Sequence, residues 1–190
     1  MNEVKSGRRA KPVRRSVARE IAYIALSVSL ITVCAWISVP VAAIPVTLQT
    51  FAVALIGALM GWKRALAAVA AYLVMGLIGI PVFAGFKAGV ATLMGATGGY
   101  IFGFAFLALF PALFKMLPVK NKWGRAAIFY GASILGLAVC YLFGTAWFVL
   151  IYDCTFVYAL TVCVVPYLIP DAVKFVFSSA IAVRVEKYVR

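Results

Sequence analysis

The chain has 190 residues, of which 66% are hydrophobic and only 12% are charged. Soluble globular proteins carry about 45–50% apolar and roughly 25% charged residues, so this chain has too few polar side chains for a water-facing surface and is predicted to be an integral membrane protein. The net charge of +13 does not indicate nucleic-acid binding, because the basic residues lie in the N-terminal tail and in short connections, where anionic lipid headgroups are the expected partners.

Apolar stretches separated by prolines, glycines and basic residues predict an all-α integral membrane bundle of six transmembrane helices. A helix needs about 20 apolar residues to span a bilayer. In chain order, the predicted helices are 21–39, 48–61, 65–80, 100–117, 126–152 and 157–183. Pro40 and Pro45 interrupt the chain after the first helix, and Pro111 is expected to kink the fourth. A basic N-terminal tail, 1–20, precedes this single membrane domain, 21–190.

The distribution of basic residues predicts which side of the membrane each connection faces. Sixteen of the 18 Lys and Arg residues fall in the tail, in the second-to-third and fourth-to-fifth connections, and after the sixth helix. Of the other two, Lys87 lies in a connection on the opposite side and Lys174 lies within the sixth helix. Because basic residues accumulate on the cytoplasmic side, six helices with both termini in the cytoplasm fit, and we expect a multi-pass protein of the cell membrane.

One of the two predicted outer connections is long, glycine-rich and mildly apolar. It runs over residues 81–99 and contains "PVFAGFKAG" and "GATGG". A loop of this composition either folds back over a cavity or is a plain flexible connection, and composition alone does not choose between the two.

Small residues recur four apart in the first helix. Ala18 and Ala22 form one such pair, and Ala25 and Ser29 form another. This spacing makes a flat stripe on which a second helix can pack closely. The stripe serves either internal packing within the bundle or docking of a partner protein, and the residues alone leave both interpretations open.

A carboxylate and an ammonium group lie in one of the most apolar segments, "VPYLIPDAVKFVFSSAIAV". Asp171 and Lys174 are three residues apart, so they share one face of a helix. An ionisable residue deep in a membrane helix costs roughly 2.5–3.5 kcal/mol, a cost that the two can share with each other and with a polar ligand. The residues fit a ligand site and a structural ion pair near the helix end equally well.

Three stretches together resemble a known family. They are "IPVTLQTFAVALIGALMG" at 44–61, "GLIGIPVFAGFKAGVATLMGATGGYIFGF" at 76–104 and "IPDAVK" at 169–174. In this order and spacing they closely resemble the BioY family, the biotin-specific S components of energy-coupling factor (ECF) transporters. The resemblance covers most of the chain from the first helix onward. Two departures are Ala96, where the family commonly has Pro in "GPTGGY", and 169–171, where it commonly has Pro-Gly-Asp.

The resemblance implies a six-helix subunit that captures biotin at the outer side with high affinity. It implies association with a transmembrane T component and two ATPase subunits, which supply the energy, and it makes Ala18, Ala22 and Ala25 the docking face for the T component. The sequence has no GxxxxGK[ST] P-loop, so any use of ATP must come from partners. We expect no cofactor and no metal.

Biotin combines an apolar bicycle and tail with a ureido group and a carboxylate, so its site needs polar partners and apolar or aromatic walls. Asp171 and Lys174 are the predicted principal partners. The further candidates, for hydrogen bonds or for walls, are Thr47, Gln49, Phe83, Phe86 and Tyr100. Each also has an ordinary interpretation: a Thr caps a helix, and an aromatic residue contacts the membrane interface or lipid.

Two other functions compete with biotin capture. An S component for a different vitamin is one, although "PVFAG" and the DxxK spacing favour biotin. A membrane-embedded enzyme is the other. The sequence argues against an enzyme, because it has no histidine, no paired carboxylates and no Ser or Cys beside a credible base.

Overall fold

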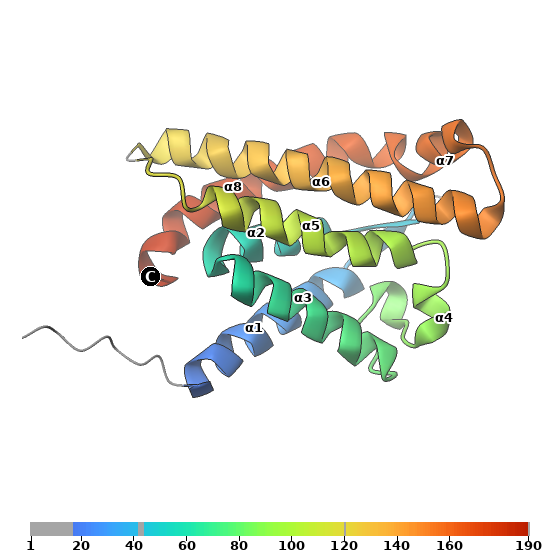
Figure 1. Ribbon diagram of the computed structural model, residues 1–190, viewed down its shortest axis with the longest axis horizontal. Helices are drawn as coiled ribbons and strands as arrows, with labels where there is room; N and C mark the ends of the chain where they lie inside the picture. The colour runs from blue at the N-terminus through green and yellow to red at the C-terminus, as the bar shows by residue number, and fades with distance from the viewer. Residues whose placement is uncertain (1–16, 42–43, 120, 190) are drawn as a thin grey trace, which may run out of the picture.

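Helices make up most of the computed structural model, which describes residues 17–41, 44–119 and 121–189 (Figure 1). The elements in chain order are α1 (Val17–Trp36), β1 (Ser38–Pro40), β2 (Pro45–Thr47), α2 (Gln49–Met60), α3 (Trp62–Leu77), η1 (Ala84–Phe86), α4 (Val90–Leu93), α5 (Gly98–Phe114), α6 (Lys122–Tyr152), α7 (Phe156–Cys163), η2 (Val165–Tyr167) and α8 (Leu168–Val189). Most of the predicted tail lies outside the described residues, and its last four residues already belong to α1.

Each of the six predicted helices contains helix in the structure, but their lengths differ. Three segments, 17–36, 122–152 and 156–188, are long and apolar enough to cross a membrane, while α2 and α5 are shorter apolar helices. With 12 residues, α2 is about 18 Å long, against a hydrocarbon core of roughly 30 Å. The count of six spans and the side on which the termini lie therefore stay predictions.

The connection between α1 and α2 departs from the all-α expectation. It forms a two-stranded antiparallel ribbon whose partners are Ser38 with Thr47, Val39 with Val46 and Pro40 with Pro45. Proline fixes an extended backbone angle and valine favours strands, so this stretch pairs with itself where a simple break was expected. The ribbon places Thr47 at the start of α2, beside the site described below.

The last predicted helix is interrupted. Val164 leaves helical geometry (φ −123°), so the chain passes from α7 through the short η2 turn into α8. Pro166 lies in this turn and lacks the N–H that a continuous helix would need. The break separates α7 from α8, and Asp171 thereby falls in the first turn of α8.

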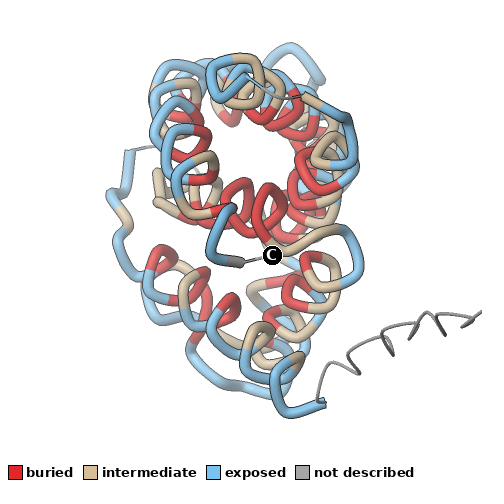
Figure 2. The backbone as a smooth tube through the Cα atoms, turned by 90° about the vertical axis from the view of Figure 1, so that its left-hand side faces the viewer, coloured by how far each residue is buried: buried red, intermediate tan, exposed pale blue. Residues whose placement is uncertain are grey.

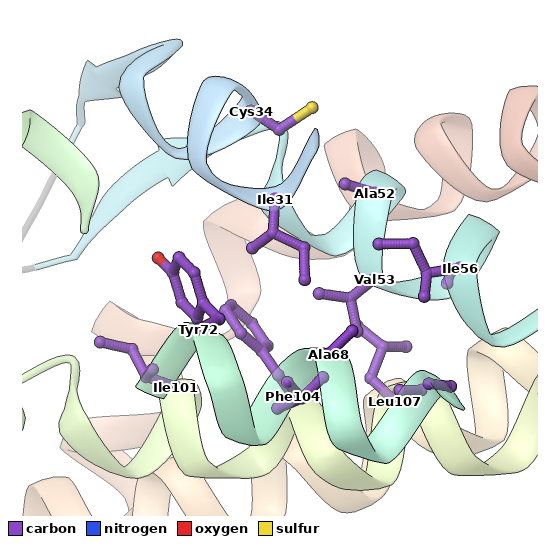
Figure 3. Packing of buried hydrophobic residues seen from close by; sticks show 14 of the residues in the cluster. Ile31, Cys34, Ala52, Val53, Ile56, Ala68, Tyr72, Ile101, Phe104 and Leu107 are labelled. Atoms are coloured by element: carbon purple, nitrogen blue, oxygen red, sulfur yellow. The ribbon is translucent and has the colours of Figure 1, made fainter. Parts of the chain in front are cut away.

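Buried residues lie on the inward sides of the helices (Figure 2). The largest cluster joins α1, α2, α3 and α5, and Figure 3 shows Ile31, Val53, Tyr72 and Leu107 meeting within it. Many large hydrophobic residues also point outward, such as Leu150, which is 80% exposed. An outward apolar surface of this kind suits contact with lipid.

Glycines allow close approach between α5 and α6. A Cβ atom added at Gly136 would lie 3.0 Å from the Cα atom of Leu107, and one added at Gly144 would lie 2.3 Å from the ring of Tyr100. Small residues at such positions let two helix backbones pack directly against each other inside a membrane. This packing fixes the part of α6 that carries Tyr141, a residue of the site.

We expect Gly136→Val to destabilise the bundle, because its side chain would enter the space occupied by α5. Overpacking typically costs about 1–3 kcal/mol, which corresponds to a melting temperature lower by about 2–10 °C for a chain of this size. Thermal unfolding of the detergent-purified protein measures this. The control is Gly131→Val, on the same helix, where an added Cβ meets nothing within 4 Å. Equal melting temperatures for the two variants would contradict the packing described here.

Candidate functional site

A cavity of about 490 Å³ lies toward the end of the bundle where α5 begins. Its walls come from the β2–α2 junction, the loop that contains η1 and α4, and the helices α5, α6, α7 and α8. Ligand pockets in proteins commonly measure about 300–1,000 Å³, so the cavity has room for a small molecule.

Asp171 is the most densely hydrogen-bonded group in the cavity. Its Oδ1 atom accepts hydrogen bonds from the Lys174 ammonium (2.7 Å) and the Thr50 hydroxyl (2.9 Å), and its Oδ2 atom accepts one from the Tyr141 hydroxyl (2.6 Å). The residue is only 3% exposed. A carboxylate offers about four acceptor positions, so one remains, on Oδ2.

Lys174 connects α8 to the β2–α2 junction. Its ammonium donates to Asp171 and to the backbone carbonyl oxygen of Thr47 (2.6 Å), with a longer contact to Thr50 at 3.5 Å. An ammonium has three N–H donors, so these contacts use most of its capacity. The pair therefore binds together α2, α6, α8 and the ribbon at the base of the cavity.

A second hydrogen-bonded chain runs from α2 to the loop over the cavity. Gln49 donates from Nε2 to the Tyr72 hydroxyl (2.6 Å), which donates to the carbonyl oxygen of Val82 (3.1 Å). The next residue, Phe83, is buried and packs edge-on against Tyr72 with ring centroids 5.4 Å apart. This chain of contacts ties the start of the loop to the core of the bundle.

Tyr100 and Tyr141 form one aromatic wall. Their rings meet edge to face with centroids 6.5 Å apart, and the Tyr100 hydroxyl shares a hydrogen bond with Thr145 (3.1 Å). The Tyr141 hydroxyl is held by Asp171. Both rings thus present apolar faces to the cavity while their hydroxyl groups are satisfied by the protein.

The structure brings six of the seven predicted site residues to this cavity. They are Thr47, Gln49, Phe83, Tyr100, Asp171 and Lys174. Phe86 is not among the lining residues: it is 63% exposed and stacks on Trp36 of α1, with ring centroids 5.0 Å apart. The hydroxyl of Thr47 accepts a hydrogen bond from the N–H of Gln49, but the cap position of α2 is Leu48, which makes no side-chain cap. The carbonyl oxygen of Thr47 holds Lys174.

The cavity also has lining residues that were not predicted, among them Thr50, Lys87, Tyr141 and Tyr167. Thr50 is three residues after Thr47 in "VTLQT", and Tyr141 is a hydroxyl-bearing residue in the middle of a long apolar helix, where a polar group needs a partner. Both signals were present in the sequence. Lys87 is an exposed cation that lines the cavity from the loop.

The predicted docking residues on α1 are all exposed. Ala18, Ala22 and Ala25 have no covering helix among the described residues. Glu20, which lies between Ala18 and Ala22 in the sequence, forms a bidentate ion pair with Arg64 of α3, and both N–O distances are 2.6 Å. This pair attaches the start of α1 to α3 and leaves the small residues facing outward.

Comparisons with known proteins place the chain in a family. The sequence model of the BioY family matches residues 5–190 of this chain. The "Probable biotin transporter BioY" of Pyrococcus horikoshii is 37% identical over 169 residues, covering 89% of this chain and 97% of the relative. The "Biotin transporter BioY" of Thermotoga maritima is 36% identical over 170 residues, covering 89% and 96%.

A solved structure shares the fold. It is described as "Crystal structure at 2.1 A of the S-component for biotin from an ECF-type ABC transporter". It superposes with a TM-score of 0.81 at 22% sequence identity and covers 95% of this chain and 100% of the other. The family match over nearly the whole length, together with relatives above a third identical, shows that this chain belongs to the BioY family.

Proposed function

We propose that this chain is the biotin-capture subunit, or S component, of an ECF-type vitamin uptake transporter in the cell membrane. Its relatives carry biotin transporter names, and the observation that carries the proposal is the buried Asp171–Lys174 pair at the base of a ligand-sized cavity. The cavity combines this charged base with aromatic walls, which is the combination that biotin requires.

The unused hydrogen-bonding capacity of the site supports one ligand orientation. Asp171 keeps one acceptor position on Oδ2, whereas Lys174 has most of its donors occupied. A ureido N–H therefore suits Asp171. The biotin carboxylate then lies toward Lys87, an exposed cation on the loop side of the cavity. Phe83, Tyr100 and Tyr141 supply apolar surface between the two ends.

The chain acts by binding and not by catalysis in this proposal. Asp171 and Lys174 are already paired with each other and with hydroxyl and carbonyl groups of the protein, an arrangement suited to holding a polar ligand. Energy comes from partners: a transmembrane T component and two ATPase subunits. The exposed stripe of Ala18, Ala22 and Ala25 is the proposed contact with the T component.

The proposed topology is a basic cytoplasmic tail, 1–20, followed by a six-helix membrane domain, 21–190, with both termini in the cytoplasm. The support is an asymmetry of charge: eight of the described Lys and Arg residues lie at the end where α3 and α6 begin, and the cavity lies toward the other end. A subunit that captures its ligand outside the cell and works with ATPase partners inside needs its cavity toward the outer surface and its basic end in the cytoplasm.

Biotin binding tests the proposed site. We expect Asp171→Asn and Lys174→Met each to weaken biotin binding by about tenfold to a hundredfold, because a hydrogen bond to a charged group is worth roughly 1.5–3 kcal/mol. Calorimetry on the detergent-purified chain measures the affinity. The matched controls are Asp153→Asn and Lys122→Met, the same chemical changes at exposed positions.

Two outcomes contradict the proposal. Near-normal biotin affinity in folded Asp171→Asn and Lys174→Met proteins would make the pair structural. Displacement of biotin by equimolar thiamine or riboflavin would point to a different vitamin as the ligand.

Partner docking has its own test. Ala22→Trp should abolish co-purification with the T component and ATPase subunits, because a bulky side chain prevents close helix packing, while biotin affinity of the isolated chain stays within about twofold. The control is Ile21→Trp, where an exposed side chain is already large. Loss of biotin binding in Ala22→Trp with the complex still assembled would show that the stripe serves internal packing.

Thiol labelling tests the topology. A Lys87→Cys substitution, made in a Cys154→Ser background, should react with a membrane-impermeant maleimide added outside intact cells, because the loop that carries it is predicted to face outward. A Lys122→Cys substitution in the same background should react only after the cells are opened. The reverse pattern of labelling would invert the proposed orientation.

A further inference from the structure

Three exposed lysines at one end of the bundle each lie beside an aromatic side chain. The three lysine–aromatic pairs are Lys63 with Trp62, Lys122 with Trp123 and Lys187 with Tyr188, at distances from ammonium to ring centroid of 5.3, 5.6 and 4.7 Å. The aromatic side chains are themselves exposed, by 43%, 74% and 75% in the same order. They belong to the start of α3, the start of α6 and the end of α8, which Figure 1 places at the same end of the bundle.

The charges at this end are not balanced by the protein. Within the described residues this end carries eight Lys and Arg residues but only two carboxylates, Glu20 and Glu186. Both carboxylates form ion pairs with arginines: Glu20 with Arg64 (2.6 Å) and Glu186 with Arg125 (3.3 Å). Across the described ranges, no ion pair involves any of the three lysines in the lysine–aromatic pairs. Among the described residues, these three lysines therefore have no counter-charge.

The pairs on α3 and α6 lie on different sides of the bundle. The helix α3 packs against α1, α2 and α5, whereas α6 packs against α5, α7 and α8, and α8 packs against α2 and α6. Viewed from this end, part of the chain forms a ring of helices, and further helices lie below the ring (Figure 2). A protein partner approaches from one side, while lipid surrounds the whole perimeter. A set of cations distributed around the bundle fits the second arrangement better.

We infer that the three lysine–aromatic pairs bind the phosphate headgroups of anionic phospholipids and fix the depth of the bundle at this membrane surface. Trp and Tyr favour the level of the headgroups, and a Lys at that level attracts anionic lipid by roughly fivefold in binding. Each pair places both groups within reach of one headgroup: the ring at the apolar boundary and the ammonium at the phosphate. The binding is independent of the ligand cavity, which lies toward the opposite end.

Two of the pairs contain a tryptophan, so the intrinsic fluorescence of the chain reports the lipid beside them. The full chain is placed in phosphatidylcholine bilayers that contain phosphatidylglycerol, with one or the other lipid brominated. Brominated lipid quenches nearby tryptophan, and the ratio of the two quenching curves gives the preference for the anionic lipid. The test variant is the triple substitution Lys63→Gln, Lys122→Gln and Lys187→Gln, and the matched control replaces the same three residues with Arg.

We expect the wild-type chain to prefer phosphatidylglycerol by roughly fivefold or more, the triple Gln variant to lose most of this preference, and the triple Arg variant to keep it. Equal quenching by both lipids in the wild type would overturn the inference, and so would an unchanged preference in the triple Gln variant. Soluble glycerol 3-phosphate distinguishes a lipid site from a site for free phosphate. If glycerol 3-phosphate abolishes the preference for phosphatidylglycerol, while sodium chloride at the same ionic strength does not, the inference is also overturned. Loss of the ATPase complex in the triple Gln variant, with lipid preference retained, would assign the lysines to a protein partner.

Discussion

A buried carboxylate and a partly buried ammonium group in an apolar bundle are the constraint on which the rest of this structure depends. Asp171 and Lys174 are separated by 2.7 Å and are nearly excluded from solvent. Charges in such surroundings are tolerated only when each is paired and hydrogen-bonded. The protein meets this requirement with Thr50 from α2, Tyr141 from α6 and the backbone of Thr47, so the pair determines how α2, α6, α8 and the β ribbon converge. The one acceptor position left on Asp171 is the position that the proposed ligand would occupy.

Packing of the helices keeps these partners in position. Glycines at the α5–α6 contact allow the two backbones to approach, and Tyr141 stands on the same helix between Gly136 and Gly144. On the other side of the cavity, Gln49 and Tyr72 connect α2 to the loop through Val82. The hydrogen bonds of the site and the close packing of the bundle therefore support each other, since a shift of either helix would break contacts to the carboxylate.

The sequence singled out Asp171 and Lys174 because an acid and a base in an apolar segment need partners, although the residues alone fitted a ligand site and a structural ion pair equally well. Thr50 and Tyr141 were missed because a hydroxyl group in a helix has several ordinary explanations. Phe83 and Phe86 looked alike in the sequence, but Gly85 and Phe86 both adopt left-handed backbone angles (φ 67° and 58°). A non-glycine residue rarely adopts such an angle, so the turn that carries Phe86 away from the cavity to Trp36 was not foreseeable. The strands of the ribbon have three residues each, too few to show an alternating pattern. The interruption before α8 was signalled by Pro166, but its geometry depends on how η2 packs.

The structure of the chain with biotin bound tests the central claim most directly. The account predicts that biotin occupies the cavity, with a ureido N–H within hydrogen-bond distance of Asp171 Oδ2 and with the ion pair between Asp171 and Lys174 intact. Biotin bound elsewhere on the chain, or bound in the cavity with none of its polar atoms near Asp171 or Lys174, would contradict it.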